Sequence, residues 1–144
     1  MTDLDIAKGE LYEENLTLAI VKDGFLLYST KSHRISGFLD AIENCGANIK
    51  GASVADRVVG KAVALLCVYA KVREVYAVIL SRKAMAVLKK NGIEHRFGEL
   101  VENVLGADKT GVCPFEKAAA EISDPEKAYN TFKGLRETLR LGKC

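Results

Sequence analysis

The sequence has few of the features that mark secreted or metal-stabilised proteins. Its four cysteines form no Cys-x-x-Cys pair, and neither of its two histidines stands near any of them. This spacing matches neither a zinc site nor the disulfide framework of a small secreted domain. The sequence therefore predicts no metal site and no cofactor.

Long apolar runs are also missing. The most apolar stretch, residues 58–70, is interrupted by Lys61 and is shorter than the ~20 residues that a membrane-spanning helix needs. The first five residues are acidic and no apolar run follows them, whereas a secretory signal peptide begins with basic residues and an apolar segment. These two absences predict a cytoplasmic protein that does not bind membranes.

No charge of one sign dominates the chain. There are 21 Lys and Arg residues against 19 Asp and Glu, with a formal net charge of +2 and a pI of about 8.3. A nucleic-acid partner is not predicted, because nucleic-acid-binding domains typically have a pI above about 9 and clustered basic residues. A basic stripe near the C-terminus is expected to face solvent, with a role as a partner surface as the minor alternative; it comprises Lys133, Arg136, Arg140 and Lys143.

What is present is the composition of one folded domain. The chain has 144 residues, of which 49% are hydrophobic and 28% charged, and it contains no repeat and no Pro- or Ser-rich linker. A chain of this length buries enough surface for a core of its own. We therefore predict a single domain over residues 1–144, and the sequence leaves open whether that domain forms a homo-oligomer.

The order of elements predicts the fold class. Helices are expected over 4–14, 35–43, 54–70, 83–90, 114–122 and 125–141, strands over 16–21, 25–30, 74–80 and 93–97, a helical turn over 100–105 and a polar loop over 106–112. The Asp-Gly pair before residue 25 is typical of a β-hairpin turn. Strands joined through helices run parallel, whereas a hairpin is antiparallel. The prediction is a three-layer α/β fold, with a mixed sheet and helices on both faces.

Ligands of α/β sheets bind at the carboxyl ends of strands, where helix N-termini also point. This rule selects residues 51–56, 81–83 and 110–114 as candidate segments. Within them Ser53, Ser81, Thr110 and Gly111 are candidate ligand-binding residues. Ser53 has the alternative role of capping the helix predicted over 54–70, and Thr110-Gly111 could simply form a turn.

Two charged residues in and near the first segment are candidates for chemistry. Lys61 is the one charged residue between Val58 and Ala70. It either reaches solvent or a structural carboxylate, or it serves a pocket as a ligand or proton-transfer group. Asp56 either complements the dipole of the predicted helix as a first-turn acid or moves protons beside Lys61.

Cys113 stands where a helix cap is expected, because Pro114 and Glu116 follow in the frame of a capping box. A thiol is an unusual cap, and a helix N-terminus favours the reactive thiolate. The functional interpretation makes Cys113 a nucleophile. The structural one makes it a small residue that packs against its neighbours.

Residues 51–62 and 110–118 together resemble a family of small bacterial and archaeal proteins of unknown function, over most of the chain. That family is similar in fold to the cytidine deaminases, which implies a mixed sheet with helices on both faces. Deaminases hold zinc through a His or Cys at one helix start and two Cys at the next. Neither 53–56 nor 81–84 contains such a ligand, so zinc-dependent deamination is not expected.

Two functions follow. The first is binding of a small polar or anionic ligand, with nucleotide-like molecules among the options, in a zinc-less deaminase-like pocket. The alternative is a metal-independent hydrolase or transferase, in which Cys113 is the nucleophile and Asp56 or Lys61 transfers protons. Whether the protein is an enzyme is left open, because no base–nucleophile pair is legible in the sequence.

Overall fold

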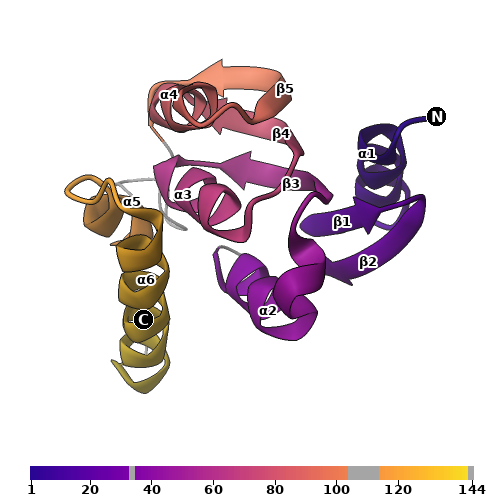
Figure 1. The fold of residues 1–144 in the computed structure, drawn as a ribbon. Helices are drawn as coiled ribbons and strands as arrows, with labels where there is room; N and C mark the ends of the chain where they lie inside the picture. The colour runs from indigo at the N-terminus through magenta and orange to yellow at the C-terminus, as the bar shows by residue number, and fades with distance from the viewer. Residues whose placement is uncertain (33–34, 104–113, 143–144) are drawn as a thin grey trace.

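A computed structural model describes residues 1–32, 35–103 and 114–142 of the chain (Figure 1). Its helices are α1 (Asp3–Glu13), α2 (Ser36–Cys45), the 3-10 helix η1 (Gly46–Ile49), α3 (Lys61–Ala70), α4 (Arg82–Lys90), α5 (Pro114–Ala119) and α6 (Pro125–Gly142). Its strands are β1 (Leu18–Lys22), β2 (Phe25–Thr30), β3 (Ser53–Val59), β4 (Glu74–Ser81) and β5 (Glu94–Val101).

The five strands form one mixed sheet in the order β2-β1-β3-β4-β5. β1 runs antiparallel to both β2 and β3, whereas β3, β4 and β5 are parallel. The predicted hairpin is confirmed: Asp23 and Gly24 have φ angles of 52° and 81°, and such positive values are those of the tight turns that suit the twist of a hairpin.

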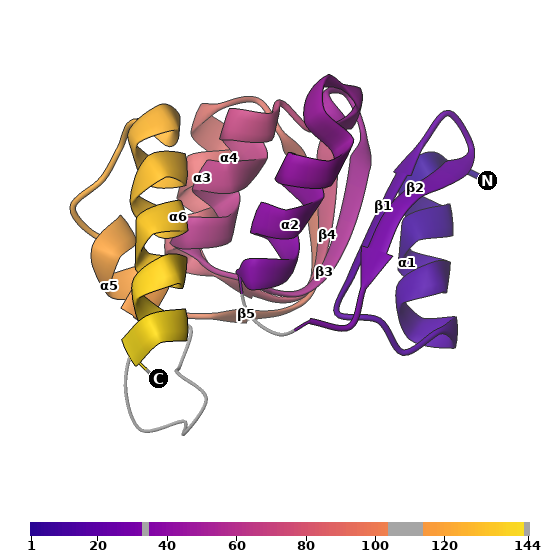
Figure 2. The same cartoon turned by 90° about the horizontal axis from the view of Figure 1, so that it is seen from below.

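Helices cover both faces of the sheet, as predicted (Figure 2). α1 lies alone on one face, where it buries Leu4, Ala7 and Leu11 against β1 and β3. The remaining helices lie on the opposite face, over the larger core, which includes Phe38, Leu66 and Phe132. The predicted α/β fold with a mixed sheet is therefore confirmed. None of the described helices combines the length and the apolar character that crossing a bilayer requires.

The long helix predicted over residues 54–70 is wrong in its first half. Residues 53–59 form β3, a central strand that pairs with β1 and β4, and the helix begins only after Gly60. A strand covered on both faces is apolar without strict alternation, and a short apolar run of this kind resembles a buried helix in sequence. The helical turn predicted from residue 100 is also wrong where it is described, because β5 extends to Val101.

The basic stripe predicted on the last helix is wrong at Arg136. Its side chain is only 6% exposed, and it lies between two acidic side chains of α2. Its Nη1 donates to Asp40 at 2.8 Å and its Nη2 to Glu43 at 2.9 Å, so Arg136 links α6 to α2. Lys133 is partly exposed and lies 5.2 Å from the ring of Tyr129. The Arg140 side chain and Lys143 lie outside the described part of the structure.

Candidate functional site

The parallel strands β3 and β4 end at the same edge of the sheet, where Val59 pairs with Leu80. A helix begins directly beyond each of them: α3 follows β3 after Gly60, and α4 follows β4 at Arg82. The N-termini of α3 and α4 therefore open at this carboxyl edge, which is where ligands of α/β sheets bind.

Asp56 is a charged residue in the middle of β3, before this edge. It lies on β3 and not, as predicted, in the first turn of a helix. Its neighbours across the sheet, Leu18 and Ala77, pack in the larger core with Cys67 of α3, so the carboxyl faces the helical layer. Burial, and to a smaller extent the charge of Asp56, raises the pKa of the Cys67 thiol. Asp56 thus extends from a strand into largely apolar surroundings.

The Asp56 carboxyl is poorly satisfied where it lies. The residue is half-buried, and its hydrogen bonds come from the backbone N–H groups of Arg57 and Val58, the latter donating to Oδ1 over a long 3.4 Å. Burial raises the pKa of Asp56 to about 7, because desolvation disfavours the charged carboxylate. Within the described residues no ion pair joins Asp56 to a cation, Lys61 included. A half-buried acid of this kind is a feature of binding and proton-transfer sites.

Lys61 is the first residue of α3, and its side chain extends toward α5. Its Nζ donates to the carbonyl oxygen of Ala120 at 3.4 Å, just beyond the C-terminal end of α5. A lysine in this position satisfies a carbonyl at the end of a helix and complements the helix dipole. This contact favours the structural interpretation of Lys61, and a role in ligand binding stays a prediction.

Glu116 also lies at this edge, and its contact with the start of α3 was not predicted from the sequence. Its Oε2 accepts the backbone N–H of Lys61 at 3.1 Å and its Oε1 that of Ala62 at 2.7 Å, so its carboxylate caps α3. A Cβ on Gly60 would lie 2.5 Å from Oε1, so a side chain at this position would displace the Glu116 carboxylate. The residues after Cys113 were interpreted as a capping box of their own helix, whereas Glu116 caps a different one.

Replacing Glu116 by Ala is expected to lower the free energy of unfolding by about 1–2 kcal/mol, because two helix N-terminal N–H groups lose a charged acceptor. Urea unfolding of both proteins measures the change. Glu121→Ala removes an exposed carboxylate after the same helix and is the matched control, expected to change stability by less than about 0.5 kcal/mol. Equal losses in the two variants would contradict the capping role.

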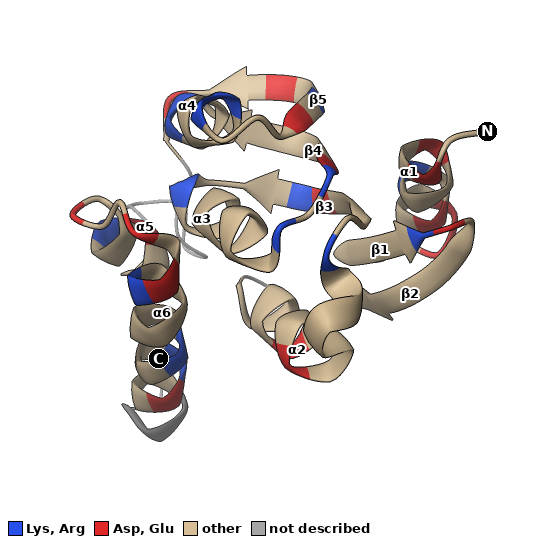
Figure 3. Cartoon of the chain, in the orientation of Figure 1, with Lys and Arg blue, Asp and Glu red and all other residues tan. Residues whose placement is uncertain are grey.

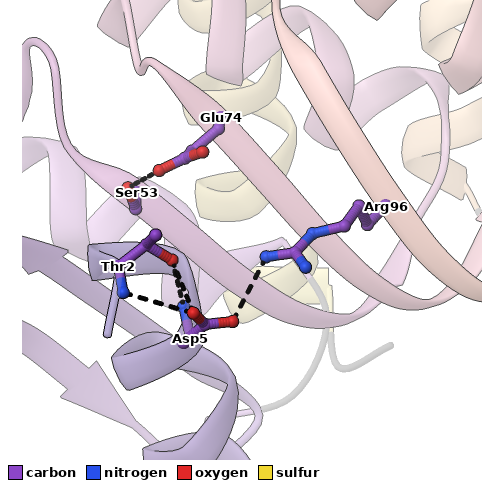
Figure 4. A network of polar contacts seen from close by, with 5 residues as sticks. All are labelled: Thr2, Asp5, Ser53, Glu74 and Arg96. Atoms are coloured by element: carbon purple, nitrogen blue, oxygen red, sulfur yellow. Dashed lines mark hydrogen bonds and ion pairs between the residues drawn. The ribbon is translucent and has the colours of Figure 1, made fainter.

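The two predicted serines lie at opposite edges of the sheet. Ser81 is at the carboxyl edge, where its Oγ accepts the backbone N–H of Ala84 at 3.1 Å and caps α4. Ser53 begins β3 at the amino edge and donates to Glu74 (Figure 4). Its predicted role as the cap of a helix is wrong, because residue 53 precedes a strand. Ser53 and Ser81 therefore cannot line one pocket.

A separate group of polar contacts lies at the start of α1. Thr2 and Asp5 form a capping box at the start of α1, and these hydrogen bonds lower the pKa of Asp5. Arg96 of β5 pairs with Asp5 at 3.5 Å (Figure 4). This exposed ion pair links the start of α1 to β5, on the face opposite to the one that Asp56 faces.

Three predicted site residues, Thr110, Gly111 and Cys113, lie outside the described residues. The role of Cys113 as a nucleophile therefore stays a prediction. Within the described ranges no group of three or more His, Cys, Asp and Glu side chains is placed to hold a metal ion. The corrected helix starts, Gly60-Lys61-Ala62 and Ser81-Arg82-Lys83, also contain no His or Cys.

Comparison with known proteins identifies the family. The model of the TM1506 family, described as a domain of unknown function (DUF1893), matches residues 6–135. The chain belongs to the TM1506 family. The solved structure of the family protein from Thermotoga maritima superposes with a TM-score of 0.83 at 25% sequence identity, covering 93% of this chain and 90% of that one. The predicted resemblance to a bacterial family of unknown function is thus confirmed.

Two further solved structures are more distant from this member of the TM1506 family. RibD from Acinetobacter baumannii has a TM-score of 0.47 and 24% identity, over 67% of this chain and 33% of that one. The diaminohydroxyphosphoribosylaminopyrimidine deaminase/5-amino-6-(5-phosphoribosylamino)uracil reductase of T. maritima has a TM-score of 0.46 and 17% identity, over 79% and 39%. No curated protein matches the chain.

Proposed function

We propose that the protein binds a small polar molecule at the carboxyl edge of β3 and β4, and that the carboxyl of Asp56 recognises it. The observation that carries this proposal is the environment of Asp56: a half-buried carboxyl whose hydrogen bonds come from the adjacent backbone, that from Val58 at a long 3.4 Å, and which forms no ion pair in the described structure. A partner that donates hydrogen bonds to the carboxylate would offset the cost of its desolvation.

The contacts at this edge favour a ligand with N–H donors over an anion. An anion would use the N-terminal N–H groups of α3 and the ammonium of Lys61. Those N–H groups already donate to Glu116, and Lys61 donates to Ala120. Asp56 remains as an acceptor. The amino and ring N–H groups of a nucleobase, or an amine, are donors of the kind that such an acceptor takes.

Binding is tested with cytidine and adenosine as nucleobase probes and inorganic phosphate as the anionic probe. We expect a nucleoside to raise the melting temperature and to lose about tenfold or more in affinity in Asp56→Asn, a loss of about 1.4 kcal/mol or more. Isothermal titration calorimetry measures both affinities. We expect no shift with phosphate.

Glu99→Gln is the control for this experiment, because it neutralises an exposed carboxylate on β5 without touching the candidate site. It should bind the nucleoside as the wild type does. Binding of phosphate alone, or unchanged nucleoside affinity in Asp56→Asn, would contradict the proposal.

A further inference from the structure

The two edge strands of the sheet differ in how they are protected against pairing with another strand. Edge strands of monomeric proteins usually carry charged residues, because an unpaired row of backbone N–H and C=O groups recruits other strands. β5 follows this rule with Glu94, Arg96 and Glu99. The sequence of β2, Phe-Leu-Leu-Tyr-Ser-Thr, contains no charged residue, and Figure 3 shows this strand without blue or red.

β2 also presents large apolar side chains to solvent beside the turn. Phe25 is 77% exposed and Leu26 is 45% exposed. The strand pairs on one side with β1, and its other side is the end of the sheet. A register shift between Ile20 and Val21 twists the hairpin there, but it puts no charge on the edge. Exposed apolar residues on an uncharged edge favour addition of a strand.

We propose that β2 is the interface of a dimer, in which the β2 strands of two copies of this chain pair antiparallel and join the two sheets into one. The charges at the two ends of β2 support a second copy as the partner. Asp23 precedes the strand and Lys31 follows it, and both are exposed. No ion pair within the described residues involves either of them.

Antiparallel pairing makes this arrangement self-complementary. Pairing over the whole strand sets Phe25 opposite Thr30 of the second copy, so that each Lys31 lies beside the turn that contains the other copy's Asp23. Lys22, the other charged residue at that turn, donates its Nζ to the carbonyl oxygen of Asn48 and does not compete for Asp23. Two reciprocal ion pairs would then flank an uncharged ladder, and they fix the orientation of the strands.

Sedimentation velocity of the full chain tests the interface. At about 100 µM, where a dimer with a micromolar Kd is populated, we expect twice the 15.7 kDa mass of one chain. Ser29→Lys places a charge on an exposed position of the edge and should raise the Kd about tenfold or more. Phe97→Lys places the same charge on β5, where residue 97 is 39% exposed, and should leave the dimer intact.

Exchanging the charges at the ends of β2 tests whether the two β2 strands pair antiparallel. This experiment is independent of the Ser29→Lys variant. Lys31→Glu gives two acidic strand ends and Asp23→Lys two basic ones, so each variant alone should dissociate and an equimolar mixture should form heterodimers. A wild-type chain that is monomeric at about 100 µM would overturn the proposal. So would a dimer that Phe97→Lys dissociates and Ser29→Lys does not, because the interface would then be β5.

Discussion

Asp56→Asn is expected to stabilise the protein by about 2–3 kcal/mol at pH 8.5 and to leave its stability nearly unchanged at pH 4. The reason is the pKa of Asp56, which burial raises from 3.8 to about 7. Above pH 7 the folded chain must hold a desolvated carboxylate, and asparagine removes that charge. Three pKa units correspond to about 4 kcal/mol, reduced here because the half-buried side chain keeps some contact with water.

The sign of the pH dependence follows from proton binding. Between pH 4 and pH 7 the folded state holds a proton on Asp56 that the unfolded state has lost. Stability therefore falls as pH rises through this window, and the full destabilisation is present above pH 7. Below pH 3.8 both states are protonated, and Asp56 has no effect on the difference between them.

Urea unfolding at a series of pH values, for wild type and Asp56→Asn, measures this effect as the difference between the two curves. Glu99→Gln serves again as the control. Its free energy of unfolding should change with pH in the same way as that of the wild type. A constant difference between wild type and Asp56→Asn across the range would show that Asp56 is not desolvated in the folded chain.

The same substitution is expected to weaken nucleoside binding about tenfold or more while it raises the free energy of unfolding. A residue that destabilises the fold and is needed for binding is the pattern expected of a functional site, because such sites keep strained or desolvated groups. If the role of Asp56 were purely structural, replacing it would instead lower the free energy of unfolding. The two measurements on one variant therefore separate a functional from a structural role.

Arg136→Met is expected to destabilise the protein by about 2–4 kcal/mol. Arg136 is 6% exposed and donates to Asp40 and Glu43, and its loss leaves two carboxylates of α2 without their cation. Breaking a fully buried pair typically costs about 3–5 kcal/mol. The loss here is expected to be somewhat smaller, because Asp40 and Glu43 are 34% and 38% exposed and can be hydrated.

Two further variants, measured in the same way by urea unfolding, separate the effect of the ion pairs from that of losing a cation. Lys133→Met removes a cation of the same helix that forms no ion pair within the described residues, and we expect a loss below about 1 kcal/mol. Adding Asp40→Asn and Glu43→Gln to Arg136→Met should recover part of the stability, because the unpaired charges are then gone. Equal losses in Arg136→Met and Lys133→Met would show that the ion pairs do not hold α6 on α2.

Several elements could be predicted from the sequence because their signals are local. The Asp-Gly pair at residues 23 and 24 predicts the hairpin, since those residue types tolerate positive φ at low cost. The continuous apolar run of β4 predicts a buried strand. Pro114 and Pro125 mark the starts of α5 and α6, since proline suits the first turn of a helix.

Residues 53–59 are a segment whose secondary structure the local sequence pattern does not determine. Their apolar pattern is compatible with a helix or with a central strand, and only pairing with β1 and β4 decides between them. Asp56 was predicted as a candidate in the first turn of a helix, whereas it lies on a strand, and its functional role stays a prediction. Its unusual pKa results from burial against the helical layer, which no spacing along the chain reveals.

The sequence by itself determined the α/β class, the hairpin and most helix boundaries, because propensities, turn residues and caps act over a few neighbouring positions. Only the tertiary structure decided that Glu116 caps α3, 54 residues away from Ala62, and that Arg136 lies between Asp40 and Glu43, 96 and 93 residues away. The physical reason is that burial and charge pairing depend on which segments meet in space. A lysine or arginine in a helical stripe has the same local pattern whether it faces water or a carboxylate.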